Sequence, residues 1–258
     1  MIRLNKNGEK ELCLISIFSS INGEAYNSGK PTVFIRTMFC NLRCKFPCDT
    51  TECWTKELFH KVYPEREDFL WLTAKQIFER VESIETNWAQ KSICLTGGEP
   101  LMEDNKEFML DELIPLFVEA GYDVGIETDG AIDYSDYKKK FGDSEIINAH
   151  GDRKGVTIIA DYKLPCSGMT DRMIKSNFNL YSENDIVKMV ISDQEEDWKE
   201  LDWIVNESGT KASIYLSPCF GKVTMNRIPE YVIAHADKHI RAQIQAHKVF
   251  WTPTQKDV

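Results

Sequence analysis

The sequence lacks any long hydrophobic run. No apolar stretch approaches the roughly 18 residues that a membrane-spanning helix needs. Residues 1–16 also lack the apolar segment and the small-residue cleavage site of a secretory signal. We therefore expect no association with a membrane, and we expect the chain to work in the cytoplasm.

Internal repeats, low-complexity tracts and Gly/Ser-rich linkers are missing too. Of the 258 residues, 42% are hydrophobic and 11% are aromatic, which is enough for a sizeable core and unlike a disordered chain. We expect a single α/β domain over residues 1–258.

An excess of positive charge is also absent, because the formal net charge is -10. An acidic chain has no general electrostatic attraction for a nucleic-acid backbone. We therefore expect no direct contact with nucleic acid and favour a small-molecule partner.

Short apolar runs alternate with helical patterns along the chain. Strands are predicted at residues 33–37, 92–96, 124–128, 156–161, 186–191 and 213–216. Helices are predicted after a capping box at 73–76, around 113–118 with Gly121 at the C-terminal end, and near 195–206 and 230–246. This alternation indicates a parallel sheet with crossover helices.

Four segments with reactive or polar side chains each lie at the end of a predicted strand or just after it. They are a cysteine-rich segment at residues 40–50, GGEP at residues 97–100, Glu127 with Thr128, and residues 161–163. The carboxyl ends of parallel strands meet at one edge of a sheet, where ligands bind. We expect these segments to form one site.

Three of the eight cysteines, Cys40, Cys44 and Cys48, are close together in the sequence. In a reducing compartment, such thiols more often bind metal than form disulfides. Three thiolates can hold a [4Fe–4S] cluster and leave one iron open to a small chelating ligand. A zinc site with Cys53 as its fourth ligand, and three unrelated buried cysteines, are the alternatives.

The segment CNLRCKFPCDT (residues 40–50) resembles the cluster loop of the radical S-adenosylmethionine (SAM) family, and residues 97–100 resemble its GGEP motif. In that family the open iron binds SAM, which is cleaved to methionine and a 5′-deoxyadenosyl radical. The family spacing is C-x3-C-x2-C, whereas this chain has C-x3-C-x3-C. Either Cys48 or Cys53 can be the third ligand, and we favour Cys48 because Asp49 and Thr50 follow it as in the closest subfamily.

The same resemblance implies a compacted TIM-type barrel of about six parallel strands and a set of SAM-binding residues. Two glycines allow backbone carbonyls to approach a ligand closely, and a carboxylate can accept hydrogen bonds from the SAM ammonium group. The predicted SAM-binding residues are Gly97, Gly98, Glu99, Glu127, Thr128 and Lys163. Outside this context, Glu127 with Thr128 is typical of an ordinary turn, and a lysine such as Lys163 is typical of a solvated sheet edge.

Three further segments resemble the family of 7-carboxy-7-deazaguanine synthases. The first segment is residues 17–36, which contains INGE at 21–24 and PTVFIR at 31–36. The other two are residues 163–169, KLPCSGM, and residues 245–248, QAHK. The resemblance extends in order over nearly the whole chain. It implies conversion of 6-carboxy-5,6,7,8-tetrahydropterin to 7-carboxy-7-deazaguanine with loss of ammonia, a step toward queuosine-type 7-deazapurines.

Residue roles follow from the matched positions. A carboxylate suits the N–H edge of a pterin, and an arginine suits a substrate carboxylate. The residues implied to bind substrate are Asn22, Glu24, Arg36, Thr96 and His247, and Thr50 is the implied Mg²⁺ ligand. The family also implies an electron donor such as flavodoxin and a homodimer. Without the resemblance, Glu24 and Arg36 are interpreted as a surface ion pair and His247 as a histidine at a helix end.

Three other functions stay open on the sequence alone. An activase of a glycyl-radical enzyme shares the cysteine loop, but residues 163–169 and 245–248 argue against it. A zinc-stabilised binding protein is the non-catalytic alternative. A diverged enzyme that cleaves SAM and acts on another substrate is the third.

Overall fold

The computed structural model describes residues 1–45, 48–84, 87–142, 145–146, 153–252 and 255–257. Within them, eleven strands form a sheet with the path β1-β2-β3-β5-β6-β8-β9-β10-β11, and β4 and β7 pair with β2 and β8 off this path. The strands are β1 (Ile2–Leu4), β2 (Lys10–Ile21), β3 (Pro31–Thr37), β4 (Leu70–Leu72), β5 (Ser92–Gly97), β6 (Asp123–Asp129), β7 (Glu145–Ile146), β8 (Arg153–Asp161), β9 (Ile186–Ile191), β10 (Ser213–Pro218) and β11 (Ile240–Ala242).

The helices are α1 (Lys56–Val62), α2 (Ala74–Ile84), α3 (Lys106–Phe108), α4 (Ile114–Glu119), α5 (Ser135–Phe141), α6 (Glu195–Asn206), α7 (Arg227–Ala234) and α8 (His247–Phe250). A π-helical turn at Met109–Leu113 joins α3 to α4. The predicted capping box is confirmed, because Thr73 and Gln76 exchange reciprocal hydrogen bonds of 3.0 and 3.2 Å at the start of α2. Gly121 ends α4 with φ +79°, as predicted.

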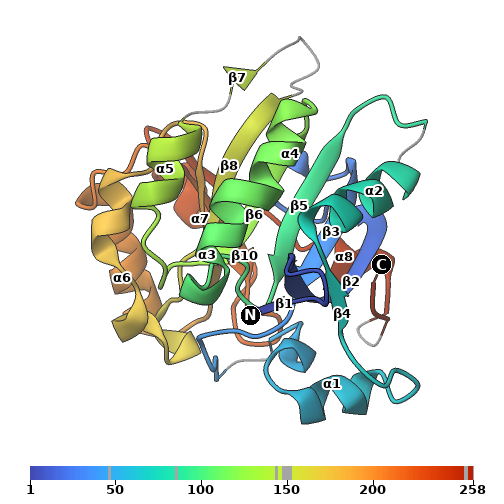
Figure 1. The fold of residues 1–258 in the computed structure, drawn as a ribbon. Coiled ribbons are helices and arrows are strands. Elements are labelled where there is room, and N and C mark those ends of the chain that lie inside the picture. The colour runs from blue at the N-terminus through green and yellow to red at the C-terminus, as the bar shows by residue number, and fades with distance from the viewer. Residues whose placement is uncertain (46–47, 85–86, 143–144, 147–152, 253–254, 258) are drawn as a thin grey trace.

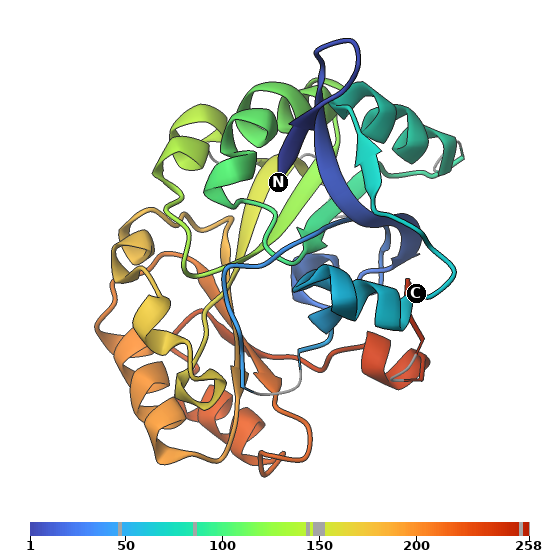
Figure 2. The same cartoon turned by 60° about the horizontal axis from the view of Figure 1, so that its bottom comes forward.

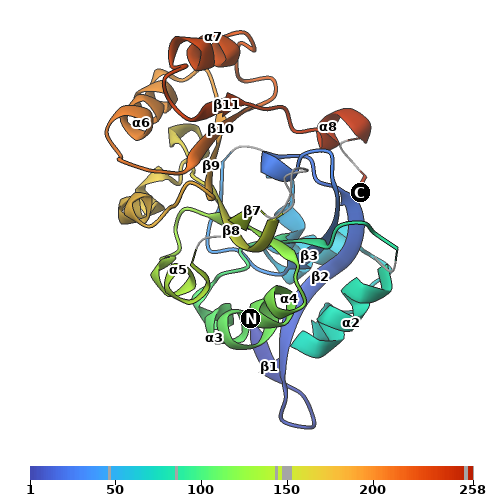
Figure 3. The same cartoon turned by 90° about the horizontal axis from the view of Figure 1, so that it is seen from above.

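The parallel part of the sheet runs from β3 through β5, β6, β8, β9 and β10 to β11. The predicted α/β fold with a partial TIM-type barrel is confirmed. The sheet curves, and α2, α4, α5, α6 and α7 lie on its outer side (Figure 3). All six predicted parallel strands are present, and β11 adds one more.

The helix predicted near residues 230–246 is confirmed only as far as Ala234, and the prediction is wrong for the rest of this range. Helix α7 ends at Ala234, and β11 follows in parallel pairing with β10. Ile240 lies opposite Ile214 and is buried. The edge of β10 offers unpaired backbone groups, and pairing with it satisfies residues 240–242 better than an extension of the helix would.

The alternation of side chains along each strand separates the core from the site. The outer-facing apolar residues of β3, β5, β6, β8 and β9 pack with α2 and α4 in one hydrophobic cluster. The opposite face carries Arg36, Thr96, Glu127, Asp161 and Lys188. Register brings neighbours together, because Arg36 lies opposite Thr96 and Asp161 lies opposite Lys188.

Candidate active site

The loops after β3, β5 and β6 are tied together by backbone hydrogen bonds. Gly98 donates to the carbonyl of Thr37 (3.0 Å), and Glu99 donates to that of Phe39 (2.8 Å). The amide of Asp129 donates to the Glu99 carboxylate (2.6 Å). The cysteine, GGEP and Glu127 segments therefore meet at one end of the sheet, as the sequence predicts (Figure 2).

The two glycines of GGEP are required by the packing of the chain against itself. Gly97 has φ +125°, and a Cβ atom there would overlap the Thr37 backbone. A Cβ atom on Gly98 would overlap the carbonyl of Phe39. Glycine is therefore required at both positions for a reason beyond the predicted one. It allows GGEP to approach the cysteine loop and not only a ligand.

Glu99 is completely buried and holds two loops together. Its Oε1 atom accepts from the amide of Leu101 (2.8 Å) and the hydroxyl of Thr128 (2.7 Å), and Oε2 accepts from the Asp129 amide. Burial, together with the nearby Asp129 carboxylate, raises the pKa of Glu99 well above its ordinary value. In this structure Glu99 and Thr128 organise the rim, and their contact with SAM stays a prediction.

Cys40, Cys44 and Cys48 are all half-buried free thiols. Burial raises the pKa of Cys40 to about 12 and that of Cys44 to about 11, while the Lys163 ammonium acts to lower both. The loop between Cys44 and Cys48 includes residues 46–47, which lie outside the described residues. No group of three or more His, Cys, Asp or Glu side chains in the described part of the chain is arranged to hold a metal ion.

The donor chemistry of this loop nevertheless fits an iron–sulfur cluster. The three thiols share one loop at the rim, and the amide of Leu42 donates to the sulfur of Cys40 (3.4 Å), as amides do around cluster thiolates. Cys53 differs from them, because it is fully buried among Cys13, Met38 and other apolar side chains. This packing supports Cys48 over Cys53 as the third ligand.

Thr50, the predicted Mg²⁺ ligand, lies between the cysteine loop and GGEP. Its hydroxyl donates to the carbonyl of Gly97 (3.1 Å) and lies 3.7 Å from the sulfur of Cys48. A hydroxyl oxygen suits Mg²⁺, which usually keeps several water ligands.

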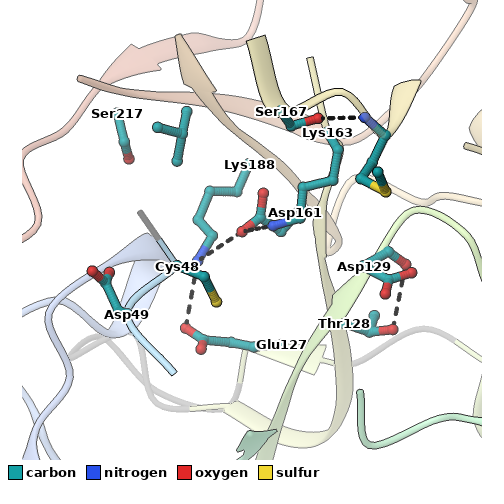
Figure 4. A network of polar contacts seen from close by, with 12 residues as sticks. Cys48, Asp49, Glu127, Thr128, Asp129, Asp161, Lys163, Ser167, Lys188 and Ser217 are labelled. Carbon is teal, nitrogen blue, oxygen red and sulfur yellow. Dashed lines mark hydrogen bonds and ion pairs between the residues drawn. The ribbon is translucent and has the colours of Figure 1, made fainter. Parts of the chain in front are cut away.

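Lys188 on β9 lies at the centre of the inner face. Its ammonium group binds Glu24. It also lies 3.8 Å from Glu127 Oε1 and 3.9 Å from Asp161 Oδ2 (Figure 4). Thr96 donates to the other Glu127 oxygen (3.0 Å). Burial alone would lower the pKa of Lys188, but the three carboxylates raise it well above its ordinary value.

Lys163, predicted to bind SAM, pairs with Asp161 at 2.9 Å. Burial would lower the pKa of Lys163, and the Asp161 carboxylate outweighs burial and raises it. Asp161 therefore stands between Lys163 and Lys188, and its Oδ2 atom faces both ammonium groups (Figure 4).

Lys188 and Asp161 were not among the residues predicted to bind a ligand. The sequence does carry a signal for Lys188, since it interrupts an otherwise apolar run at residues 186–191. A lysine in such a strand is rarely buried unless it is paired. Its partners are far away in the sequence, so only the fold identifies them.

The predicted substrate residues Asn22, Glu24 and His247 are brought together. Asn22 Oδ1 accepts from the Glu24 amide (3.1 Å), and the amide of Ala246 donates to the carbonyl of Gly23 (3.0 Å). A Cβ atom on Gly23 would lie 2.8 Å from His247 Nδ1, so a glycine is needed there. Glu24 and Arg36 do not form a surface ion pair with each other. Glu24 binds Lys188, and Arg36 lies beside Asp257.

Comparisons with known proteins agree with the geometry of the site. No protein-family model matches the chain. A 7-carboxy-7-deazaguanine synthase of Clostridium acetobutylicum is 31% identical over 246 residues, which covers 95% of this chain and 98% of that protein. The chain belongs to the 7-carboxy-7-deazaguanine synthase family.

Other members of this family are similar over most of their length. The 7-carboxy-7-deazaguanine synthase of Methanospirillum hungatei is 28% identical over 93% of this chain and 86% of its own. The crystal structure of QueE from Escherichia coli matches with a TM-score of 0.62 at 19% identity, over 92% of this chain and 95% of that one. The family and the fold that the sequence motifs predict are confirmed.

The described part of the chain contains no helix that is long and apolar enough to span a membrane. Three buried carboxylate oxygens of the site could each accept a hydrogen bond from a ligand. In the described residues, Glu24 Oε1, Asp129 Oδ2 and Asp161 Oδ1 are buried without a hydrogen-bond partner. Buried acceptors of this kind fit ligands that are rich in N–H and O–H donors, as SAM and a pterin are.

Proposed function

We propose that the chain is a radical SAM lyase that converts 6-carboxy-5,6,7,8-tetrahydropterin to 7-carboxy-7-deazaguanine and ammonia. The observation that carries this proposal is the state of Glu24, which is 5% exposed, with one oxygen bound to Lys188 and the other without a donor in the described structure. A buried acceptor left without a donor costs about 1–3 kcal/mol. A pterin offers a row of N–H groups that would satisfy it.

The other predicted substrate residues would add complementary chemistry to this carboxylate. Arg36 would bind the carboxylate of the substrate, since a guanidinium can donate two parallel hydrogen bonds. Thr96 holds Glu127 from the neighbouring strand. His247 and Asn22 would close the site from the Gly23 loop, which both of them contact.

Cys40, Cys44 and Cys48 would hold a [4Fe–4S] cluster, with Thr50 close by for Mg²⁺. When bound, the cluster and SAM supply the one-electron chemistry that removes a hydrogen atom from the substrate. The residues proposed to bind SAM are Gly97, Gly98, Glu99, Glu127, Thr128 and Lys163. The Lys163 ammonium also favours the thiolate forms that cluster binding requires.

The remaining parts of the proposal concern partners and compartment. Reduction of the cluster would need an external electron donor such as flavodoxin. All eight cysteines are free thiols in the structure, which agrees with a reducing cytoplasm. A homodimer is proposed from the family resemblance.

The test is anaerobic reconstitution with iron and sulfide, followed by incubation with SAM, a reductant, Mg²⁺ and the carboxylated tetrahydropterin. We expect 7-carboxy-7-deazaguanine to form in excess of 5′-deoxyadenosine, because loss of ammonia from the pterin is redox-neutral and the abstracted hydrogen atom must be returned. Formation of 5′-deoxyadenosine without the deazaguanine would keep the radical SAM class and reject the substrate. A preparation that binds zinc and gains no broad visible absorption would reject both.

A further inference from the structure

Lys188 is one of the most buried ammonium groups in the described structure, at 6% exposure. Its neighbours on β9, Val187 and Met189, face the hydrophobic core, so alternation turns Lys188 to the inner face. Carboxylates from three separate segments meet its Nζ atom: Glu24 from the loop before β3, Glu127 from β6 and Asp161 from β8. A lysine in this position controls how three acidic side chains are oriented.

The contacts of Lys188 divide the oxygen atoms of two carboxylates unequally. The Lys188 ammonium group donates a hydrogen bond to Oε2 of Glu24 and lies 3.9 Å from Oδ2 of Asp161. The other oxygen of each, Glu24 Oε1 and Asp161 Oδ1, is buried and has no partner among the residues that the structure describes. Lys188 thus fixes one side of Glu24 and, together with Lys163 at 2.9 Å, one side of Asp161, which leaves the opposite side of each carboxylate for a ligand.

We propose that Lys188 is a positioning residue for substrate recognition, which holds Glu24 and Asp161 so that their second oxygens accept N–H or O–H groups of the pterin. The proposal rests on the function proposed above and adds to it a residue and a mechanism of orientation. Lys188 itself acts through Glu24 and Asp161. Its positive charge also keeps three carboxylates close together at one point of the site, where they would otherwise repel one another.

A role in orientation differs measurably from a role in stability. If Lys188 serves recognition through Glu24, its removal matters only while Glu24 is a carboxylate. The effects of the two substitutions on the KM for the pterin will then not multiply, which is the signature of coupled residues. A purely structural lysine would lower the melting temperature and leave the KM unchanged.

The experiment uses the reconstituted enzyme with Lys188→Gln, Glu24→Gln, the double variant and Lys188→Arg. We expect Lys188→Gln and Glu24→Gln each to raise the KM for the pterin and the Kd of the product by about tenfold or more, because each loses a buried charged hydrogen bond. The double variant should have the same KM for the pterin as Glu24→Gln alone. Lys188→Arg should recover most of the affinity, and the Kd of SAM should change less than the KM for the pterin.

Lys138→Gln is the matched control. Lys138 is a mostly buried lysine that pairs with the buried Asp185 at 2.8 Å, away from the active site. We expect this variant to lower the melting temperature without changing the KM. If Lys188→Gln fails to fold, Lys188→Met, which keeps the length of the side chain and removes the charge, replaces it in the same comparison, and an unchanged KM in Lys188→Met would overturn the proposal.

The outcomes separate this inference from the proposed function. Wild-type turnover of the pterin combined with multiplicative effects of the two substitutions would overturn the role of Lys188 alone. An unchanged KM in Lys188→Gln would do the same. A wild-type enzyme that cleaves SAM and neither binds nor converts the pterin would overturn both.

Discussion

Asp257 lies beside Arg36, with 3.7 Å between its Oδ1 atom and the Nε atom of the arginine. Ser16 donates to the same carboxylate at 2.7 Å and Tyr63 donates to it at 3.3 Å. Its neighbour Lys256 pairs at 3.1 Å with Glu52, which is almost completely buried. The chain therefore holds one of its own carboxylates against the arginine that the proposed function assigns to the substrate carboxylate.

Asp257→Asn should lower the KM for the pterin by about two- to fivefold, the range expected for loss of one partly exposed ion pair. The substitution removes the charge that competes for Arg36 and keeps a group that Ser16 can bind. Steady-state kinetics measure the effect. Asp193→Asn, which removes an aspartate paired with Arg227 of α7 at 2.9 Å, is the control and should leave the KM unchanged. A higher KM in Asp257→Asn would show that Asp257 helps to bind the substrate.

Gly97→Ala should destabilise the protein and prevent cluster binding. The residue has φ +125°, and the added Cβ would overlap the backbone of Thr37, so the cysteine loop must move. Overpacking of this kind costs about 1–3 kcal/mol beyond the conformational penalty. Gly209→Ala is the matched control, since Gly209 also has positive φ (+70°) and a Cβ there meets nothing within 4 Å.

Iron content after reconstitution and the melting temperature are the two measurements for these glycine variants. In Gly209→Ala the free energy of unfolding should fall by about 1–2 kcal/mol, the cost of a non-glycine residue in the left-handed conformation, and the iron content should be unchanged. Equal losses of iron in both variants would mean that the contact between GGEP and the cysteine loop is unimportant for the cluster.

Glu99→Gln should change how stability depends on pH. Burial raises the pKa of Glu99 above its ordinary value of 4.5, so the folded state keeps a proton that the unfolded state releases. That contribution to stability is complete below pH 4.5 and is lost as pH rises toward the folded-state pKa. Glu99→Gln removes this part of the pH dependence.

Urea unfolding at several pH values between about 5 and 8 tests this expectation. As pH rises, the urea concentration at the unfolding midpoint of Glu99→Gln should increase relative to that of the wild type. Glu119→Gln, at a side chain that is exposed in the folded protein, is the control. A constant difference for Glu99→Gln would mean that the folded protein holds Glu99 with no preference for its proton.

The strands and the convergence of their loops follow from local sequence patterns. Period-two alternation, the capping box at Thr73 and Gln76, and Gly121 are all signals within a few neighbouring residues. The antiparallel strands β1, β2 and β4 were not predicted, because the motif at residues 17–24 gave no sign of its partners. Strand β11 has three residues and depends on the edge of β10.

The contacts at the centre of the site depend on the fold as a whole. Lys188 is separated from Glu24 by 164 positions in the sequence, and Asp257 from Ser16 by 241. No local pattern indicates which charges will share a buried space. Resemblance to a family supplied Glu24, Arg36 and His247, but it supplied neither Lys188 nor Asp257.

Cys48→Ala and Cys53→Ala should behave differently in cluster binding. Cys48 is half-buried at the rim beside Thr50, whereas burial among apolar side chains raises the pKa of Cys53 far above its ordinary value. Cys53 is 0% exposed and packed among apolar side chains, so iron has no access to its sulfur in this structure. We expect Cys48→Ala to lose the iron and the broad visible absorption after anaerobic reconstitution, and Cys53→Ala to keep both. Cys94→Ala, which removes another buried thiol from β5, controls for packing loss. Loss of the cluster in Cys53→Ala alone would make Cys53 the third ligand and require the segment at residues 48–53 to rearrange when iron binds.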